Sequence, residues 1–251
     1  EGENKKIPVK TMPEVFRYSV DKLGQIVDRA LKLKIPMVAI FPQTNSGLKD
    51  SYGSEALNEN NLVCKAIRKI KDKYKNEIGI MTDVALDPYT SHGHDGILRN
   101  KRILNDETIE ILIQQSLLQA QMGSDVIAPS DMMDGRIGEI RQELDNNSLK
   151  DIKILSYAVK YASSFYGPFR DAVGSKKSLK GDKKTYQMDY SNSEEALREV
   201  ALDIKEGADL VMVKPGLPYL DIIKKVKENF KIPVLACLLY TSPSPRDQLQ
   251  S

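Results

Sequence analysis

The sequence is poor in cysteine, and the two residues it has, Cys64 and Cys237, lie far apart. This spacing excludes a disulfide framework and any zinc or redox site built on a C-x-x-C motif. No apolar run approaches the roughly 20 residues of a membrane span, and the first residues, EGENKKIPVK, lack the apolar segment of a signal peptide. We therefore expect a reducing compartment and no membrane partner.

Neither sign of charge is in marked excess. Lys and Arg number 37 and Asp and Glu 35, which gives a formal net charge of +2. Bulk charge therefore gives no reason to expect a nucleic-acid partner. Hydrophobic residues make up 41% of the 251 residues, enough for a large core. The length fits one large domain or two small ones, and also a single α/β barrel of about 250 residues.

Short apolar runs alternate with segments whose apolar residues recur at helical spacing. Ser19 is the expected N-terminal cap of the first helix, Ser191 and Glu194 form a capping-box pattern before a later one, and Gly207 is a typical helix end. The pattern predicts strands at 37–41, 78–84, 125–128, 153–159, 209–213 and 232–236, and helices at 19–31, 57–75, 106–122, 135–145, 218–230 and from Ser191 onward.

This alternation is typical of a parallel sheet with right-handed crossovers. The pattern opens on a helix and supplies six strands, where a closed barrel has eight. We therefore predict an α/β fold, a (β/α)8 TIM barrel that is incomplete in this chain. Two long stretches without periodicity, 85–104 and 160–190, follow strands and so belong to the carboxyl face, where α/β barrels place their chemistry.

Two lysines end apolar strands. Lys160 follows ILSYAV and Lys214 follows DLVMV, so both ammonium groups are expected at the carboxyl ends of consecutive strands. A lysine beside a second cation in an apolar wall has a lowered pKa, and its neutral amine attacks a ketone to form a Schiff base. Surface lysines are the alternative for either residue alone, but two such placements together favour a catalytic pair.

The segment TDVALDPYTSHGHDG carries Asp83, Asp87 and Asp95 together with His92 and His94. Carboxylates clustered on a glycine-containing loop suit a hard cation such as Mg²⁺. They are equally compatible with acid/base groups or with ordinary turn formers. The HGH pair resembles a metal pair, but without cysteine or a third nearby histidine it gives little support for zinc.

Further polar residues lie on the loops that follow strands. Arg170 and the neighbours Lys183 and Lys184 lie after Lys160, where an arginine fork could clamp a substrate carboxylate or the cations could belong to a solvated basic loop. Ser130 and Asp131 could position a base or cap a helix. The residues alone indicate a Schiff-base barrel enzyme for a carboxylate-bearing carbonyl substrate. A class I aldolase is an alternative, but it needs only one lysine.

Five strings together resemble the porphobilinogen synthase family, also called delta-aminolevulinic acid dehydratase. They are DVALDPYTSHGHDG, APSDMMDGR, SYAVKYASSFYGPFRDAVGS, GDKKTYQMD and MVKPGLPYLDI, and the resemblance runs from about residue 1 to 236. It implies a (β/α)8 barrel that condenses two molecules of 5-aminolevulinate into porphobilinogen, an early step of tetrapyrrole and heme synthesis. It also implies a homo-octamer and no organic cofactor.

The resemblance assigns roles to individual residues. Those that match the catalytic and substrate-binding positions are the Schiff-base residues Lys160 and Lys214, the carboxylate-binding cations Arg170 and Lys183, the polar pocket residues Asp83 and Asp131, and the pocket lining Ser130 and Tyr166. Ala85, Asp87 and Asp95 match three cysteines of zinc-dependent members. This replacement implies the magnesium-type branch, because oxygen ligands favour Mg²⁺ over Zn²⁺. Glu199 matches a ligand of a stimulatory Mg²⁺ and is otherwise a solvated helix residue.

The two ends depart from the family pattern. The resemblance implies an assembly arm and a first strand before residue 1, and a Ser-Gly-Glu-Tyr motif where CLLYTSPSPRDQLQS follows Ala236. We therefore expect residues 1–236 to form a partial barrel domain and 237–251 to be a disordered tail outside the family. An inactive fragment that only associates with full-length subunits is the alternative to a working enzyme. The expected location is the bacterial cytoplasm, with a plastid as the alternative.

Overall fold

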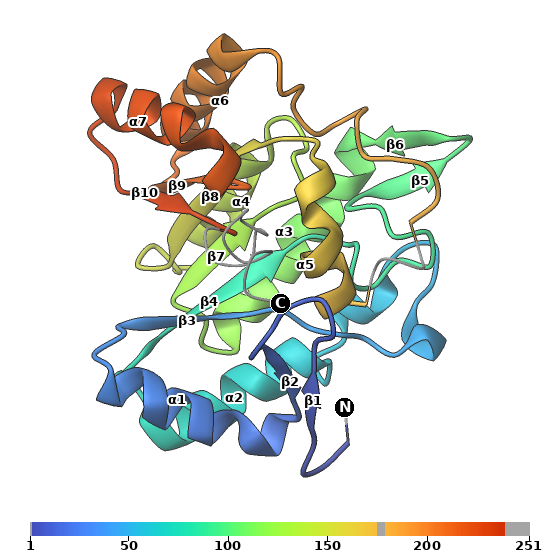
Figure 1. The fold of residues 1–251 in the computed structure, drawn as a ribbon, viewed down its shortest axis with the longest axis vertical. Helices are drawn as coiled ribbons and strands as arrows, with labels where there is room; N and C mark the ends of the chain where they lie inside the picture. The colour runs from blue at the N-terminus through green and yellow to red at the C-terminus, as the bar shows by residue number, and fades with distance from the viewer. Residues whose placement is uncertain (1, 175–178, 239–251) are drawn as a thin grey trace.

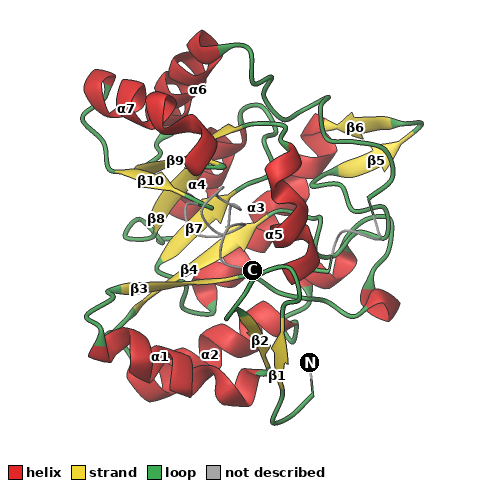
Figure 2. Ribbon diagram, viewed as in Figure 1, coloured by secondary structure: helices red, strands yellow, loops and turns green. Residues whose placement is uncertain are grey.

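The fold is built on one parallel sheet of six strands, in the order β10-β9-β8-β7-β4-β3 (Figures 1 and 2). It is seen in a computed structural model that describes residues 2–174 and 179–238. The strands are β3 (Met37–Ile40), β4 (Gly79–Val84), β7 (Val126–Pro129), β8 (Lys153–Lys160), β9 (Leu210–Lys214) and β10 (Val234–Ala236). The sheet is curled as part of a barrel, and the prediction of a TIM-barrel fold with six strands present is confirmed.

Helices connect these strands and cover the outer face of the sheet. Helices α1 and α2 lie beside β3, whereas α6 and α7 lie beside β9 and β10 (Figure 1). The helices are α1 (Leu23–Lys32), α2 (Leu62–Tyr74), α3 (Asn105–Gln121), α4 (Arg136–Asn146), α5 (Gly167–Ala172), α6 (Ser193–Glu206) and α7 (Leu220–Asn229). Short 3-10 turns lie at Val20–Lys22, Ser46–Leu48, Ser54–Leu57, Ser164–Tyr166 and Leu217–Tyr219. Every predicted helix is present.

The central strands are buried on both faces, which explains why they read as continuous apolar runs. In β8, Leu155 and Tyr157 face one cluster, with Met81 and Met212, on the inner side of the sheet. Ile154 and Ala158 alternate with them and pack into a second, larger cluster with the helices. This double packing holds the carboxyl ends of the strands in fixed relative positions.

The predicted helix caps differ from the structure in two ways. Ser19 is the N-cap residue of the 3-10 turn Val20–Lys22 that precedes α1, but its hydroxyl makes no capping hydrogen bond and accepts instead from the Lys5 amide at 2.9 Å. Asn192, and not Ser191, is the N-cap of α6, since its side chain accepts from the amide of Glu195 at 3.3 Å. Gly207 does end α6, with a φ of 108° that favours glycine.

Two antiparallel hairpins were not predicted. One pairs β1 (Lys6–Pro8) with β2 (Phe16–Tyr18), and the other pairs β5 (Ile97–Arg99) with β6 (Arg102–Leu104) inside the long loop after β4. Each strand has only three residues, too few for a periodic pattern. Among the described residues, no helix is long and apolar enough to cross a membrane. Most of the predicted tail, 239–251, lies outside the described residues.

Candidate active site

Lys160 and Lys214 are neighbours at the carboxyl edge of the sheet, because β8 and β9 pair in parallel with these two residues opposite each other. The register depends on an irregularity in β8. Ser156 lies opposite Val211 but Val159 lies opposite Val213, so one extra β8 residue is accommodated between them. With regular pairing from Ser156, Val159 would face Lys214. The bulge therefore places both lysines on the same face of the sheet.

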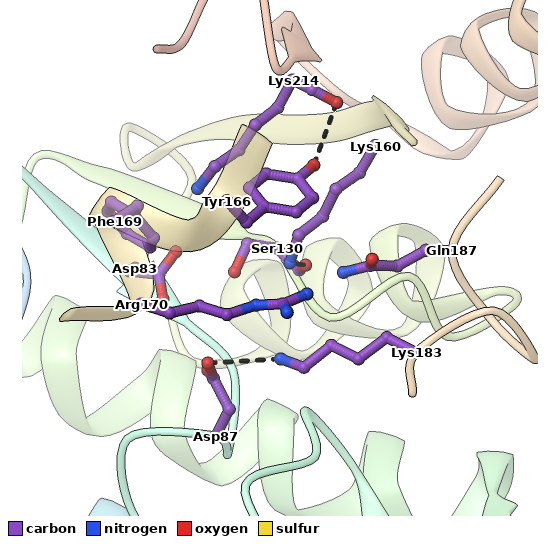
Figure 3. A pocket seen from close by; sticks show the side chains of 10 residues that line it. All are labelled: Asp83, Asp87, Ser130, Lys160, Tyr166, Phe169, Arg170, Lys183, Gln187 and Lys214. Atoms are coloured by element: carbon purple, nitrogen blue, oxygen red, sulfur yellow. Dashed lines mark hydrogen bonds and ion pairs between the residues drawn. The ribbon is translucent and has the colours of Figure 1, made fainter. Parts of the chain in front are cut away.

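The two lysines open into one small cavity of about 40 Å³, shown in Figure 3. Its walls come from the ends of β4, β7, β8 and β9 and from the segment after β8 that includes α5. The lining residues are Asp83, Asp87, Ser130, Lys160, Tyr166, Phe169, Arg170, Lys183, Gln187 and Lys214. A larger cavity of about 820 Å³ lies beside β3, α1 and α2, but none of the predicted site residues lines it.

Aromatic rings surround the Lys214 ammonium group. Its Nζ lies 4.1 Å from the ring centre of Phe169, 5.0 Å from that of Tyr157 and 5.8 Å from that of Phe41. No carboxylate in the described part of the chain is within ion-pair distance of this nitrogen. The amine is therefore held in a largely apolar wall, and the Tyr166 hydroxyl fixes the backbone below it by donating to the Lys214 carbonyl at 3.1 Å.

The Lys160 amine has a more polar environment. Its Nζ donates to the backbone carbonyl of Ser130 and lies 3.5 Å from Asp95 Oδ1. Burial lowers the pKa of Lys160, Asp95 offsets part of this effect, and the positive charges of Lys183 and Lys214 lower it further. The Lys160 amine is thus uncharged more often near neutral pH than the amine of an exposed lysine, and the uncharged amine is the form that attacks a carbonyl carbon.

Lys183 joins the two loop carboxylates. Its Nζ lies 2.8 Å from Asp95 Oδ2 and 3.4 Å from Asp87 Oδ2, and all three side chains are buried or nearly so. Burial by itself would raise the pKa of Asp95, but the ammonium groups of Lys160 and Lys183 outweigh it and hold that pKa below its usual range. These carboxylates therefore already have cationic partners within the protein.

This arrangement does not fit a divalent ion at Asp87 and Asp95. An ammonium group lies between the two carboxylates, and Ala85, which matches the third cysteine position of zinc-dependent members, is fully buried and has no donor atom in its side chain. Within the described ranges, no three His, Cys, Asp or Glu side chains are grouped so that they could hold a metal ion. The two aspartates instead orient the cations of the cavity.

The two loop histidines hold the loop and do not point into the cavity. His94 Nδ1 lies 3.0 Å from the Tyr186 hydroxyl, and its Nε2 lies 2.8 Å from the Lys180 carbonyl. His92 Nε2 lies 3.2 Å from the Ser51 carbonyl. The HGH motif therefore ties the loop after β4 to the segment 180–186, which carries Lys183.

Asp83 is the buried carboxyl group of the cavity. Burial is the largest effect on it and raises its pKa to about 6, against the opposing influence of Lys214. Its Oδ1 has no hydrogen-bond partner among the described residues. A carboxyl group with a pKa near 6 exchanges protons readily at neutral pH, so its chemistry suits a general acid or base.

Besides Asp95, which contacts lining residues but does not line the cavity itself, two predicted residues lie outside the cavity. Asp131 is fully buried, but its Oδ2 accepts from the Met133 amide at 2.8 Å and its Oδ1 lies 3.3 Å from Arg136 Nε. Glu199 is half-buried on α6, at the outer side of the sheet, where burial and then the charges of Asp203 and Glu195 raise its pKa. Neither residue can touch a molecule bound between the two lysines.

Two cavity residues were missed from the sequence. Phe169 packs on the Lys214 amine, and its place in FYGPFRDA beside Arg170 could have indicated it. Gln187 lines the wall near Lys160, and no sequence signal distinguishes it from other polar residues of its loop. Eight predicted residues line the same cavity: Asp83, Asp87, Ser130, Lys160, Tyr166, Arg170, Lys183 and Lys214. Asp95 contacts two of them, Lys160 and Lys183.

The fold and this cavity define an α/β-barrel protein with two buried lysines at the carboxyl face of its sheet, suited to carbonyl chemistry. The sequence profile of the family described as delta-aminolevulinic acid dehydratase matches residues 1–240. The chain belongs to this family.

Known proteins support the same assignment. A delta-aminolevulinic acid dehydratase of Bradyrhizobium diazoefficiens is 58% identical over 236 residues, which are 94% of this chain and 67% of that protein. One from Methanothermus sociabilis is 50% identical, covering 94% of this chain and 72% of its own length. The crystal structure of the Toxoplasma gondii enzyme in complex with its reaction product porphobilinogen matches with a TM-score of 0.92 and 43% identity, over 96% of this chain and 69% of that one.

Proposed function

We propose that this protein is a porphobilinogen synthase, which condenses two molecules of 5-aminolevulinate into porphobilinogen with loss of two waters, in tetrapyrrole and heme synthesis. The observation that carries the proposal is the pairing of Lys160 with Lys214 across adjacent strands, with both amines in one cavity. Two amines at one site suit a reaction that joins two ketones, whereas a class I aldolase uses only one. The product bound by the Toxoplasma gondii relative supports the same reaction.

The chemistry follows from two Schiff bases. Each lysine amine attacks the ketone carbon of one substrate molecule, and each condensation releases one water. One Schiff base loses an α-proton to become an enamine, and its carbon attacks the C=N carbon of the other to form the carbon–carbon bond. Loss of a second proton from the attacking carbon then breaks the C–N bond to one lysine, which leaves as an amine while a C=C bond forms. The free substrate amino group adds to the remaining C=N carbon, the second lysine leaves as an amine, and loss of a proton from a ring carbon gives the pyrrole. In this scheme Asp83 moves protons at the bound carbons, because its carboxyl group lies in the same cavity with a pKa of about 6.

Cations on the segment after β8 would bind the substrate carboxylate. The Arg170 guanidinium lies 5.7 Å from the Tyr166 ring and lines the cavity, and Lys183 enters it from the opposite side (Figure 3). An arginine fork matches a carboxylate with two parallel hydrogen bonds, and a lysine adds a point charge. Tyr166 and Ser130 would line the bound substrates.

We expect Lys183→Met to weaken substrate binding and to destabilise the protein. The substitution leaves Asp87 and Asp95 buried without their shared cation, a loss that costs about 3–5 kcal/mol for buried pairs. The KM for 5-aminolevulinate should rise at least about tenfold, as one charge-assisted contact is lost. Steady-state kinetics and thermal unfolding would measure both effects. Lys184→Met is the matched control, because Lys184 is exposed on the same loop, and an equal KM increase in that variant would contradict the assignment.

We propose Mg²⁺ as the metal of this protein, bound by Glu199 and not by the loop aspartates, and no zinc in the active site. A single half-buried carboxylate suits Mg²⁺, which keeps most of its waters when it binds a protein. Mg²⁺ added after chelation should stimulate turnover of the unsubstituted chain, and isothermal titration should detect its binding. Glu199→Gln should lose both responses, whereas Asp87→Asn should keep Mg²⁺ binding. Binding lost in Asp87→Asn and kept in Glu199→Gln would contradict the proposal.

The assembly and location are part of the same proposal. We infer a homo-octamer of this family's kind, located in the bacterial cytoplasm. A plastid is the alternative, since relatives include a chloroplastic delta-aminolevulinic acid dehydratase of Glycine max, of which this chain covers 57%.

Incubation of the purified chain with 5-aminolevulinate tests the proposed function. Ehrlich reagent should detect porphobilinogen, with two substrate molecules consumed for each product molecule formed. A folded chain that forms no pyrrole, with or without Mg²⁺, would contradict the proposal and favour a fragment that only associates with other subunits.

A further inference from the structure

Arg136, at the start of α4, has a fully buried guanidinium group that connects four parts of the fold. Its Nε lies 3.3 Å from Asp131 Oδ1, and its Nη1 donates to the Met133 carbonyl at 3.1 Å. Nη1 also lies 3.7 Å from Asp203 Oδ1 on α6, and Nη2 donates to Ser156 Oγ on β8 at 3.3 Å. The Ser156 hydroxyl donates in turn to Asp203 at 2.5 Å. None of these residues lines the active-site cavity.

The turn that Arg136 holds carries a direct contact to Lys160. Ser130 accepts the hydrogen bond from Lys160 Nζ through its backbone carbonyl, and its amide donates to the Val84 carbonyl at 3.0 Å. Two residues later Met132 has a φ of 73°, a backbone conformation that a methionine rarely adopts. The surroundings must therefore impose the shape of this turn, and hydrogen bonds with the side chains of Asp131 and Arg136 are among the contacts that do so.

We propose that Arg136 is a positioning residue for Lys160, acting through the turn Ser130–Met133. Its guanidinium fixes both Asp131 and the Met133 carbonyl, and so holds the Ser130 carbonyl at the Lys160 amine. This inference rests on the proposed Schiff-base function of Lys160. The same inference gives Asp131 a role behind the cavity wall, because its carboxylate links Arg136 to the Met133 amide of the turn.

An arginine is required at this position because of the directions of its contacts. The planar fork reaches a carboxylate on each of two elements, a carbonyl and a hydroxyl at the same time. A lysine in its place keeps the positive charge between Asp131 and Asp203 but cannot make all four contacts. A glutamine loses the charge as well.

The experiment compares Arg136→Gln and Arg136→Lys with Arg141→Gln. Arg141 lies on the same helix and makes contacts of the same kind, donating to the Ile152 carbonyl at 2.8 Å and pairing with Asp145, but it does not touch the turn. Each variant is treated with 5-aminolevulinate and borohydride, and the rate of labelling at Lys160 and at Lys214 is read by peptide mass spectrometry. Hydrogen exchange of the turn amides, Met133 in particular, is measured without substrate.

In Arg136→Gln, labelling at Lys160 should slow at least about tenfold relative to labelling at Lys214, and the Met133 amide should exchange faster. Arg136→Lys should slow Lys160 labelling by an intermediate factor. Arg141→Gln should leave the ratio of the Lys160 to the Lys214 labelling rate unchanged, and also the exchange rate of the Met133 amide. The inference would be overturned if Arg136→Gln slowed labelling equally at both lysines, or if it left the exchange rate of the Met133 amide unchanged. Failure of the unsubstituted chain to label either lysine would refute the proposed function instead, and the exchange measurement would still decide whether Arg136 holds the turn.

Discussion

Replacing Lys214 with methionine is expected to abolish porphobilinogen formation, with a loss of at least about a thousandfold in turnover. The amine is the atom that forms the covalent bond to the substrate, and removal of a covalent catalyst costs this much or more in enzymes of other kinds. Methionine has nearly the same length and suits the wall of Phe169 and Tyr157. The fold should therefore survive, with an unchanged or higher midpoint of thermal unfolding.

Lys160→Met provides the paired comparison. It should also abolish product formation, but each single variant should still form a Schiff base on the lysine it retains. A Lys214→Met variant that retains more than about a tenth of the original turnover would contradict the need for two amines. It would favour a mechanism with one Schiff base.

The second large effect is expected for Asp83→Asn, which should slow the reaction and stabilise the protein. As a proton carrier in the cavity, Asp83 should contribute about 10²–10⁴ in rate. Its pKa of about 6 predicts that kcat/KM of the unsubstituted enzyme falls as pH drops through 6, because the carboxylate becomes protonated. This acid limb should disappear in Asp83→Asn. Assays between pH 5 and 8 by the Ehrlich method would measure it.

The effect on stability has the opposite sign. The pKa of Asp83 rises from 3.8 to about 6 on folding, so between these values the folded chain holds a proton that the unfolded chain has released. This contribution is fully present below pH 3.8 and is lost as pH rises through about 6, where the buried carboxylate ionises. At pH 8 the ionised group costs about 3 kcal/mol, a cost that asparagine removes.

Denaturant unfolding at pH 8 and at pH 5 would test the stability effect. Asp83→Asn should be more stable than the unsubstituted chain at pH 8, and the difference should shrink at pH 5. Asp151→Asn, at an exposed position, should show no such pH-dependent gain. A variant that is less stable than the original at pH 8 would show that the buried carboxylate has stabilising partners in the folded protein.

The strands and the two lysines could be predicted because both depend on local patterns. Runs such as ILSYAV are apolar throughout since both faces of the central strands are buried, and a lysine directly after such a run must lie at a strand end. The grouping of Asp83, Lys160 and Lys214 then follows from the parallel order of the strands. The residues alone also indicated Arg170 and Lys183. The resemblance gave these two the carboxylate-binding role and added Tyr166, and all three line the cavity.

Other features depend on contacts that are distant in the sequence. The β8 bulge that aligns Lys160 with Lys214 has no signal in ILSYAVK, because it is defined only by the pairing with β9. The composition of the acidic loop is compatible with a metal site, but Lys183, about 90 residues away along the chain, lies between Asp87 and Asp95. Likewise, the resemblance assigns Asp131 to the pocket, whereas its side chain turns to the buried Arg136.

Borohydride trapping with isotopically labelled 5-aminolevulinate tests whether both lysine amines form Schiff bases. Reduction should attach the label to both Lys160 and Lys214 in the same chain, as peptide mass spectrometry would show, and exposed lysines such as Lys184 should stay unlabelled. Label on only one of the two lysines, or on neither in a folded chain, would contradict the proposed pair of Schiff bases.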